Sequence, residues 1–349
     1  MSDAPSSGDE RNYSAYADIA RVEQDDGPCP VAPIRYAPDY KILMDIFRGV
    51  LHKGEYSERG LDLTQEIIEY NAASYTVWQY RRDCLRRISD PPYNLDQEIF
   101  FLDTFAGENP KNYQIWHHRR AVVDMIAERA SGNSSSCSSG GMSGPDVRRE
   151  LLFTESVFND DPKNYHAWAH RQYVVSTFGG FEGELAFVQQ LLDTDIRNNS
   201  AWNHRWFVLH RIAGGGGIAW NSNPVPVGTL AGEVDYAFAA IAKAPNNESA
   251  WNYLRGLHHY HPTETKGSIE ARLLSMHEQV RAQEPQGNSR LGECVHFLAF
   301  VAEVLEKTGA LQGARQLLLS LCALDTVRMK VYERDLHRIA GALRIDEGV

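Results

Sequence analysis

Apolar residues recur with the spacing of an amphipathic α-helix in five separate segments of the chain. In each segment they stand at positions i, i+3, i+4 and i+7, which places them on one face of a helix. The five segments are LDLTQEIIEY at 61–70, LDQEIFFLDTFA at 95–106, VRRELLFTESVF at 147–158, ELAFVQQLLDT at 184–194 and EVDYAFAAIAKA at 233–244. No stretch alternates apolar and polar residues for long enough to form a sheet. The pattern predicts an all-α protein, in which each segment is helix A of a helical hairpin.

A tryptophan in a related sequence context follows each of these segments. The five copies read NAASYTVWQYRR, NPKNYQIWHHRR, DPKNYHAWAHRQ, DIRNNSAWNHRW and PNNESAWNYLRG, around Trp78, Trp116, Trp168, Trp202 and Trp251. Successive tryptophans lie 38, 52, 34 and 49 residues apart, and the two long intervals contain glycine-rich segments that look inserted, 131–144 and 214–228. Without these segments the period is 34 to 38 residues, which is the length of one helical hairpin.

The residues around each tryptophan predict how helix B, the second helix of the hairpin, begins and packs. Four places before the tryptophan stands a residue whose side-chain oxygen can cap the helix: Ser74, Asn112, Asn164, Asn198 and Asn247. Three places after it, or four in the last copy, stands an arginine: Arg81, Arg119, Arg171, Arg205 and Arg255. We expect each arginine to stack on the tryptophan ring or to bond loop carbonyls of the next repeat.

Further helices extend the array at both ends. Two pairs without the tryptophan follow the marked copies and one helix precedes them, at 267–283 with 288–307, at 310–323 with 326–343, and at about 39–52. The predicted fold class is an all-α, α-α superhelix, a crescent-shaped right-handed solenoid of about seven hairpins.

Two regions are predicted along the chain. Residues 1–38 are acidic and proline-rich, and we expect a disordered or extended arm there. Residues 39–349 form the helical-repeat domain, with flexible insertions at 131–144 and 214–228.

Composition and charge narrow the classes of partner. The chain has 349 residues and a formal net charge of −11, from 46 Asp and Glu against 35 Lys and Arg. Nucleic-acid binding usually needs a basic surface, so this charge argues against it. No stretch reaches the roughly 20 apolar residues of a membrane span. The polar start MSDAPSSGDERNYS also lacks the apolar core of a signal peptide. We expect a cytoplasmic protein without membrane insertion.

Histidines are the candidate metal ligands, and the sequence argues against them. His118, His170 and His204 recur at one offset from the tryptophans, which suggests core histidines that bond loops. No Cys or carboxylate adjoins the run HHYH at 258–261, and HxxH alone is a weak metal pattern. We therefore expect no metal site in this chain.

The turns before helix B in the second and third copies are the candidate binding site. They read PKNYQIW and PKNYHAW and place Lys111 and His166 beside the N-terminal ends of helices, where backbone N–H groups favour an anion. Both residues differ from their counterparts in the fourth and fifth copies. This difference favours a specific role, and a phosphate-bearing small molecule is the predicted ligand. The concave face of a solenoid usually binds a protein, so an interaction scaffold is the other reading from the residues alone.

The five copies, with KNYQIWHHRR and a closing NESAWNYLRG, resemble the prenyltransferase α-subunit repeat family. Within it, the chain is similar to the α subunit shared by protein farnesyltransferase and protein geranylgeranyltransferase type I. The resemblance covers about residues 39–343. It implies a heterodimer with a β subunit that holds zinc, with magnesium as a further cofactor. It also implies transfer of a farnesyl or geranylgeranyl group from its diphosphate to the cysteine of a C-terminal CaaX motif, as in Ras- and Rho-type GTPases.

The resemblance also implies roles for individual residues. Lys111 would be the catalytic lysine beside the isoprenoid diphosphate, with Tyr113 near the reacting centre. The next turn would supply diphosphate contacts from Asn164, Tyr165 and His166.

The CaaX peptide has two implied partners in this chain. The amide of Gln114 would hold its C-terminal carboxylate, and Tyr75 would border the pocket for its last residue. Two alternatives remain open: a non-enzymatic helical-repeat scaffold, and the α subunit of a Rab-type geranylgeranyltransferase.

Overall fold

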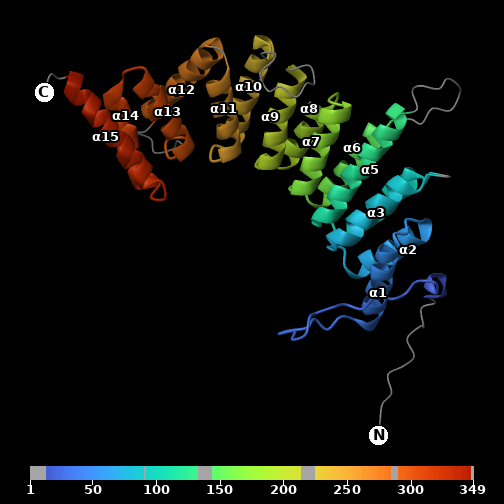
Figure 1. Ribbon diagram of the computed structural model, residues 1–349. Helices are drawn as coiled ribbons and strands as arrows, with labels where there is room; N and C mark the ends of the chain where they lie inside the picture. The colour runs from blue at the N-terminus through green and yellow to red at the C-terminus, as the bar shows by residue number, and fades with distance from the viewer. Residues whose placement is uncertain are drawn as a thin grey trace, which may run out of the picture. The chain divides into compact units, whose positions relative to one another are not determined.

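The computed structural model describes residues 13–89, 92–132, 144–213, 225–261, 263–283 and 290–346. These residues form a short 3₁₀-helix and fifteen α-helices, with no strand among them (Figure 1). The chain divides into two compact units, Met1–Val174 and Val175–Val349. Most of the two insertions predicted at 131–144 and 214–228 lies outside the described residues.

Unit 1 holds the first three marked repeats. Its elements are η1 (Tyr13–Tyr16), α1 (Pro38–Lys53), α2 (Glu58–Tyr70), α3 (Tyr75–Arg87), α4 (Leu95–Glu108), α5 (Tyr113–Gly132), α6 (Val147–Asp160) and the larger part of α7 (Tyr165–Phe178). Helices α2, α4 and α6 are the predicted helices A, and α3, α5 and α7 are the helices B. Helix α2 packs against α1 and α3, α4 packs against α5, and α3 also packs against α5 of the next repeat.

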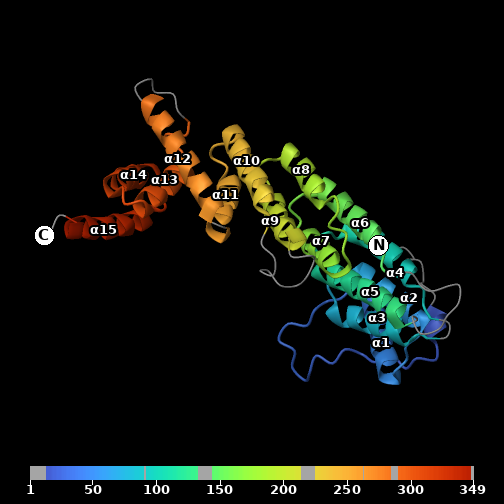
Figure 2. The same ribbon diagram turned by 90° about the horizontal axis from the view of Figure 1, so that it is seen from above.

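Unit 2 continues the same arrangement. Its helices are α8 (Glu184–Thr194), α9 (Asn199–Ala213), α10 (Val227–Lys243), α11 (Glu248–Tyr260), α12 (Thr263–Gln283), α13 (Val295–Lys307), α14 (Leu311–Leu324) and α15 (Met329–Asp346). The two pairs that lack the tryptophan are α12 with α13 and α14 with α15, and each pair packs as a hairpin (Figure 2). The predicted all-α superhelical fold class is confirmed. No helix among the described residues is both long and apolar enough to cross a bilayer.

The repeat tryptophans are core residues that also fix the turn before helix B. All five indole rings are buried. Each indole N–H donates to the carbonyl oxygen six residues earlier, at 2.7–3.0 Å, in the pairs Trp78 to Ala72, Trp116 to Pro110, Trp168 to Pro162, Trp202 to Ile196 and Trp251 to Pro245. A buried indole needs such an acceptor, and here the acceptor sets the path of the turn. The same local bond is therefore built into every marked repeat.

The predicted helix caps are confirmed in four repeats and wrong in one. The side-chain oxygens of the four asparagines accept backbone N–H groups of the first helical turn, in Asn112, Asn164, Asn198 and Asn247. Ser74 stands at the N-cap of α3 but its side chain makes no capping bond. The start of α3 therefore lacks the capping bond that the other four repeats share.

The expectation for the arginines is corrected by the packing. Arg81 lies over the ring of Phe101, Arg119 over Phe153 and Arg205 over Tyr236, all rings of the following helix A. The same three guanidinium groups form bidentate ion pairs with buried carboxylates of that helix: Arg81 with Glu98, Arg119 with Glu150 and Arg205 with Glu233. The main partner is thus a carboxylate of the next repeat, because a buried guanidinium needs a counter-charge.

The recurring histidines are core residues as predicted, but their partners are carboxylates and not loops. The Nε2 atoms lie 2.6–2.7 Å from glutamate oxygens in the pairs His118 with Glu98, His170 with Glu150 and His204 with Glu184. In the fifth copy Tyr253 replaces the histidine and donates to Glu233. Glu98, Glu150 and Glu233 therefore each join an arginine of the preceding repeat to helix B of their own repeat.

The arm predicted at 1–38 is described from residue 13. Tyr16 and Ile19 are buried, and the Tyr16 hydroxyl donates to the Arg59 carbonyl oxygen at 2.9 Å. Asp18 pairs with Arg59 and Lys53 at 2.7 Å. Residues 13–19 thus pack against α1 and α2, whereas residues 20–37 form no helix.

Candidate functional site

The candidate site lies in unit 1, where two turns precede α5 and α7. The turn at 109–112 carries Lys111, and the turn at 161–164 carries Asn164. We call these two turns, with the first two residues of α5 and of α7, the KNY edge. All predicted site residues except Tyr75 lie on it.

Asn164 holds the two turns together. Its Oδ1 accepts the N–H groups of His166 at 2.9 Å and Ala167 at 3.1 Å, and its Nδ2 donates to the Pro110 carbonyl oxygen at 3.0 Å. The side chain is 2% exposed. Asn247 bonds the Ile196 carbonyl oxygen in the same way in unit 2, so this is a repeated structural bond. The hydrogen bonds of the Asn164 amide therefore mainly stabilise the fold.

Aromatic rings surround His166. Its ring lies 4.3 Å from that of Tyr113 at an interplanar angle of 86°, and 6.2 Å from that of Trp116 at 15°. Burial lowers the pKa of His166 below its ordinary value, although a hydrogen bond with the Lys111 backbone acts in the opposite direction. The lowered pKa favours the neutral imidazole near pH 7, which can donate one hydrogen bond and accept another.

Lys111 extends into solvent from the first turn. Its side chain is 78% exposed, and Nζ lies 3.4 Å from Oδ2 of Asp161 in the second turn. The other oxygen of Asp161 accepts the backbone N–H of Lys163 at 3.0 Å, which orients the carboxylate toward Lys111. An exposed ion pair of this kind is weak and exchanges readily with another anion.

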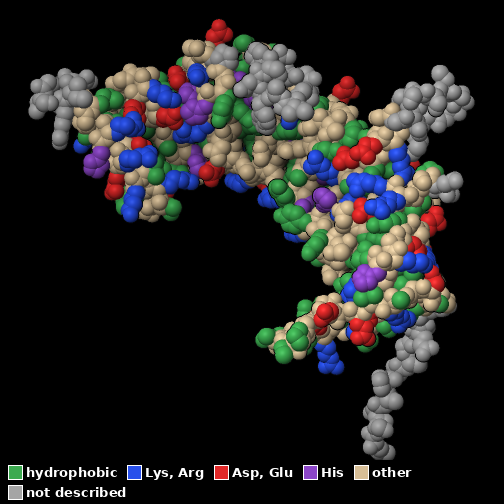
Figure 3. Space-filling model, in the orientation of Figure 1, with side chains coloured by type: hydrophobic (Ala, Val, Ile, Leu, Met, Phe, Trp, Pro, Cys, Tyr) green, Lys and Arg blue, Asp and Glu red, His purple; other side chains and the backbone are tan. Residues whose placement is uncertain are grey.

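Three exposed tyrosines mark the same position in consecutive repeats. Tyr75, Tyr113 and Tyr165 are the first residues of α3, α5 and α7, and they are 72%, 69% and 69% exposed. Figure 3 shows hydrophobic side chains, in green, at the edge of unit 1 where these helices begin. Large exposed rings in a row are typical of a surface that binds a ligand or another protein. In the sequence, this row of tyrosines corresponds to a tyrosine three residues before each of the first three repeat tryptophans.

The structure brings some predicted residues into contact and not others. Tyr113, Tyr165 and His166 meet through ring contacts, and Asn164 bonds the His166 backbone. Gln114 follows Tyr113 in α5 and is partly exposed. Within the part of the chain that is described, no side-chain hydrogen bond, ion pair or ring contact joins Gln114 or Tyr75 to the other predicted residues. Asp161, which sequence reasoning missed, is the added member of the site.

Similarity to known proteins identifies the family. A family model described as protein prenyltransferase alpha subunit repeat matches residues 57–88, 95–126, 147–178, 181–212 and 230–261. The protein farnesyltransferase/geranylgeranyltransferase type-1 subunit alpha of Dictyostelium discoideum is 40% identical over 266 residues, covering 69% of this chain and 68% of that protein. The chain belongs to the protein prenyltransferase alpha subunit family. The family recognised from the repeats is confirmed.

Two further similarities agree with this family. The subunit of the same name from Solanum lycopersicum is 46% identical over 243 residues, covering 70% of this chain and 62% of that protein. A solved structure described as Candida albicans protein geranylgeranyltransferase-I complexed with GGPP matches with a TM-score of 0.74 and 28% sequence identity. That match covers 95% of this chain and 100% of that chain. The five family repeats coincide with the hairpins from α2/α3 to α10/α11.

Proposed function

We propose that this chain is the α subunit of a heterodimeric CaaX protein prenyltransferase. With a β subunit it transfers a farnesyl or geranylgeranyl group to the cysteine thiol of a C-terminal CaaX motif. The observation that carries the proposal is the KNY edge, where an exposed ammonium, a largely neutral imidazole and exposed tyrosine rings meet. The names of the relatives, farnesyltransferase/geranylgeranyltransferase type-1 subunit alpha, support the same role.

The proposed chemistry places the isoprenoid diphosphate against Lys111. The bond between C1 of the isoprenoid and the diphosphate oxygen breaks, and the cysteine sulfur forms a new bond to C1. The diphosphate leaves with the electron pair, so its negative charge grows in the transition state. The ammonium of Lys111 stabilises that charge, and His166 and Tyr165 donate hydrogen bonds to the diphosphate oxygens. Asn164 contributes by holding the two turns in register.

The remaining groups act on the peptide or belong to the partner subunit. The Gln114 amide donates to the C-terminal carboxylate of the CaaX peptide, while Tyr75 and Tyr113 border the peptide and the reacting centre. Zinc belongs to the β subunit, where it would supply the activated cysteine thiolate. Magnesium is expected with the diphosphate. The substrates are CaaX-terminated proteins of the Ras and Rho type.

Co-expression with candidate prenyltransferase β subunits tests the function. We expect the chain to co-purify with a β subunit and the complex to prenylate a CaaX peptide, but not the same peptide with serine in place of cysteine. Both farnesyl and geranylgeranyl diphosphate should be offered. A stable chain that takes no β subunit would support the scaffold alternative. Activity only on Rab proteins with an escort protein would support the Rab-type alternative.

Replacing Asp161 by asparagine is expected to tighten isoprenoid diphosphate binding. The carboxylate is the anion that the diphosphate would displace from Lys111. An exposed ion pair is worth about 0.2–1 kcal/mol, so the Kd should fall by about 1.4- to fivefold. Asparagine keeps the oxygen that accepts the Lys163 N–H. The measurement is a calorimetric titration of the heterodimer with farnesyl diphosphate. Asp160→Asn removes the same charge one residue away and should change the Kd less. Weaker binding in Asp161→Asn would show that Asp161 positions Lys111 instead of competing for it.

A further inference from the structure

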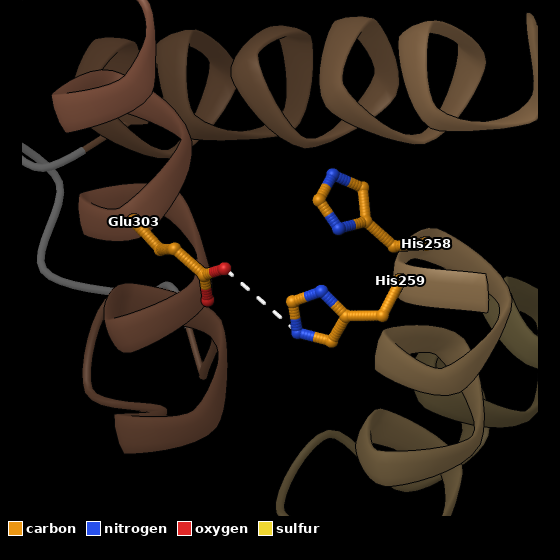
Figure 4. A group of neighbouring side chains, drawn as sticks. All are labelled: His258, His259 and Glu303. Atoms are coloured by element: carbon orange, nitrogen blue, oxygen red, sulfur yellow. Dashed lines mark ion pairs between the residues drawn. The ribbon is translucent and has the colours of Figure 1, made fainter. Parts of the chain in front are cut away.

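A second cluster of polar side chains lies in unit 2, away from the KNY edge. His258 and His259 stand near the C-terminal end of α11, and Glu303 faces them from α13 (Figure 4). One nitrogen or oxygen atom from each of the three lies within 4.8 Å of the other two. The sequence places no carboxylate beside the HHYH run, and the fold supplies one from a separate helix.

The hydrogen bonding of His258 leaves one ring nitrogen available. The residue is 2% exposed, and its Nε2 lies 2.8 Å from Oε1 of Glu270 on α12. An ionised carboxylate only accepts hydrogen bonds, so in the neutral ring Nε2 carries the proton and Nδ1 keeps a lone pair. Nδ1 is buried and has no hydrogen-bond partner among the described residues. A carboxylate on one ring nitrogen is how proteins orient a histidine whose other nitrogen binds a metal.

The other two side chains complete a set of ligands around this nitrogen. Figure 4 shows the rings of His258 and His259 next to each other, with the Glu303 carboxylate facing them from α13. The Nε2 of His259, whose side chain is 48% exposed, lies 3.9 Å from Oε1 of Glu303. His118 also has a buried Nδ1 without a partner. However, in the described part of the chain only His258 has a second imidazole and a carboxylate within reach.

Two cations already contact Glu303 and would compete with a metal ion. Lys307 lies 2.8 Å from Oε1 and Arg255 contacts Oε2. A carboxylate has about four lone-pair positions. Arg255 can therefore stay on Oε2 while an ion replaces Lys307 at Oε1, since the Lys307 side chain is 48% exposed and free to move into solvent.

We propose that His258, His259 and Glu303 form a site for a divalent transition metal, with Zn²⁺ as the expected ion. Two imidazoles and one carboxylate suit zinc, and water would fill the fourth position. Zinc ligands lie about 2.0–2.2 Å from the ion, so donors in a tetrahedral site stand about 3.3–3.6 Å apart. Rotation of the exposed His259 side chain and of the partly exposed Glu303 side chain closes the remaining gap. The bound ion joins α11 to α13, and the site is separate from the zinc proposed for the β subunit.

Metal counting on the full-length chain tests the site. The chain, with any partner needed for solubility, is dialysed against micromolar ZnCl₂, and zinc per chain is measured by atomic absorption. Wild type should carry one equivalent more than His259→Gln, a difference that cancels zinc held by a partner. The matched control His52→Gln removes an exposed histidine of α1 and should equal wild type. Equal zinc in wild type and His259→Gln would overturn the proposal.

Two further variants separate ligation from general surface binding. Lys307→Gln frees Oε1 of Glu303 and should tighten Zn²⁺ binding several-fold. Glu270→Gln weakens the bond that orients His258 and should raise the Kd by about 10- to 100-fold. Circular dichroism melts confirm that each variant is folded. If Lys307→Gln leaves the Kd unchanged, Glu303 is not a ligand and the proposed site is wrong.

Discussion

Replacing Lys111 by alanine is expected to lower kcat for prenyl transfer by about 10²- to 10³-fold, the usual effect of removing one donor that stabilises transition-state charge. The Kd of the isoprenoid diphosphate should change far less, because the charge on the leaving group grows mainly in the transition state. The Lys111 side chain is 78% exposed and pairs only weakly with Asp161, so truncation should leave the fold intact. Single-turnover kinetics on the heterodimer separate the chemical step from binding.

Lys163→Ala is the matched control for this experiment. Lys163 occupies the equivalent place in the PKNY motif of the next repeat, and it has no assigned role in the reaction. Its loss should reduce kcat by only a small factor, since it removes general positive charge from the same edge. Equal losses in the two variants would contradict a specific role for Lys111. A Lys111→Ala variant that loses binding and rate in equal measure would contradict the proposed role in the chemical step.

Replacing Glu98 by glutamine is expected to lower the free energy of unfolding by about 3–5 kcal/mol. This is the usual cost of removing one charged partner from a buried ion pair. Glu98 is fully buried and accepts two hydrogen bonds from Arg81 and one from His118, all at 2.7 Å. The variant leaves the buried Arg81 without its counter-charge, and a guanidinium cannot lose its proton to compensate. Urea unfolding of wild type and variant measures the difference. Glu108→Gln, at the exposed end of α4, is the control and should change stability by less than about 0.5 kcal/mol.

The same network predicts how stability depends on pH. Burial opposes ionisation of Glu98, but the charge of Arg81 and the hydrogen bond with His118 hold its pKa at about 2. The unfolded carboxyl titrates near 4.3, so the stability that Glu98 contributes is complete above that pH and is lost as pH falls toward 2. Burial lowers the pKa of His118 to about 4. The hydrogen bond to Glu98 and the charge of Glu98 act in the opposite direction but are outweighed. Because the unfolded histidine takes up its proton near pH 6.5, stability also falls between pH 6.5 and 4.

Urea midpoints measured from pH 7.5 down to pH 3 check this dependence. Wild type should lose stability throughout acidification, first through the histidine and then through the carboxylate. The gap between wild type and Glu98→Gln should be widest near neutral pH and should narrow below about pH 4.3, where the unfolded carboxyl is protonated. A gap that stays constant down to the lowest pH would show that Glu98 is not ionised in the folded protein.

Most of the fold could be predicted from the chain because its information is local. The apolar spacing of helices A and the recurring tryptophan each depend on a few neighbouring residues. Trp116, for example, bonds a carbonyl only six residues away. The asparagine caps are equally local, as Asn112 and Asn164 show. Because such contacts join residues of the same repeat, the repeat sequence predicts the helical hairpins, their order along the chain and the length of one repeat.

The partners of the buried charges could not be identified in this way. Arg81 and Arg119 bond Glu98 and Glu150 of the following helices, and this pairing depends on how one hairpin stacks on the next. The sequence does contain a regular spacing that points to these glutamates. Each lies 20 residues before the histidine or tyrosine that it bonds, as in Glu98 with His118 and Glu150 with His170.

The sequence by itself determined the family, the helical class and the positions of Lys111, Tyr113 and His166 at the starts of helices. Only the tertiary structure decided which side chains of other repeats and helices lie next to the candidate residues. It set Asp161 against Lys111, used the amide of Asn164 to join two turns, and brought Glu303 to His258 and His259.

The physical reason lies in the range of the interactions. Helix periodicity and caps act over a few residues, so a single chain segment specifies them. Ion pairs and ligand clusters form between side chains of different helices, and their distances exist only after the helices have packed.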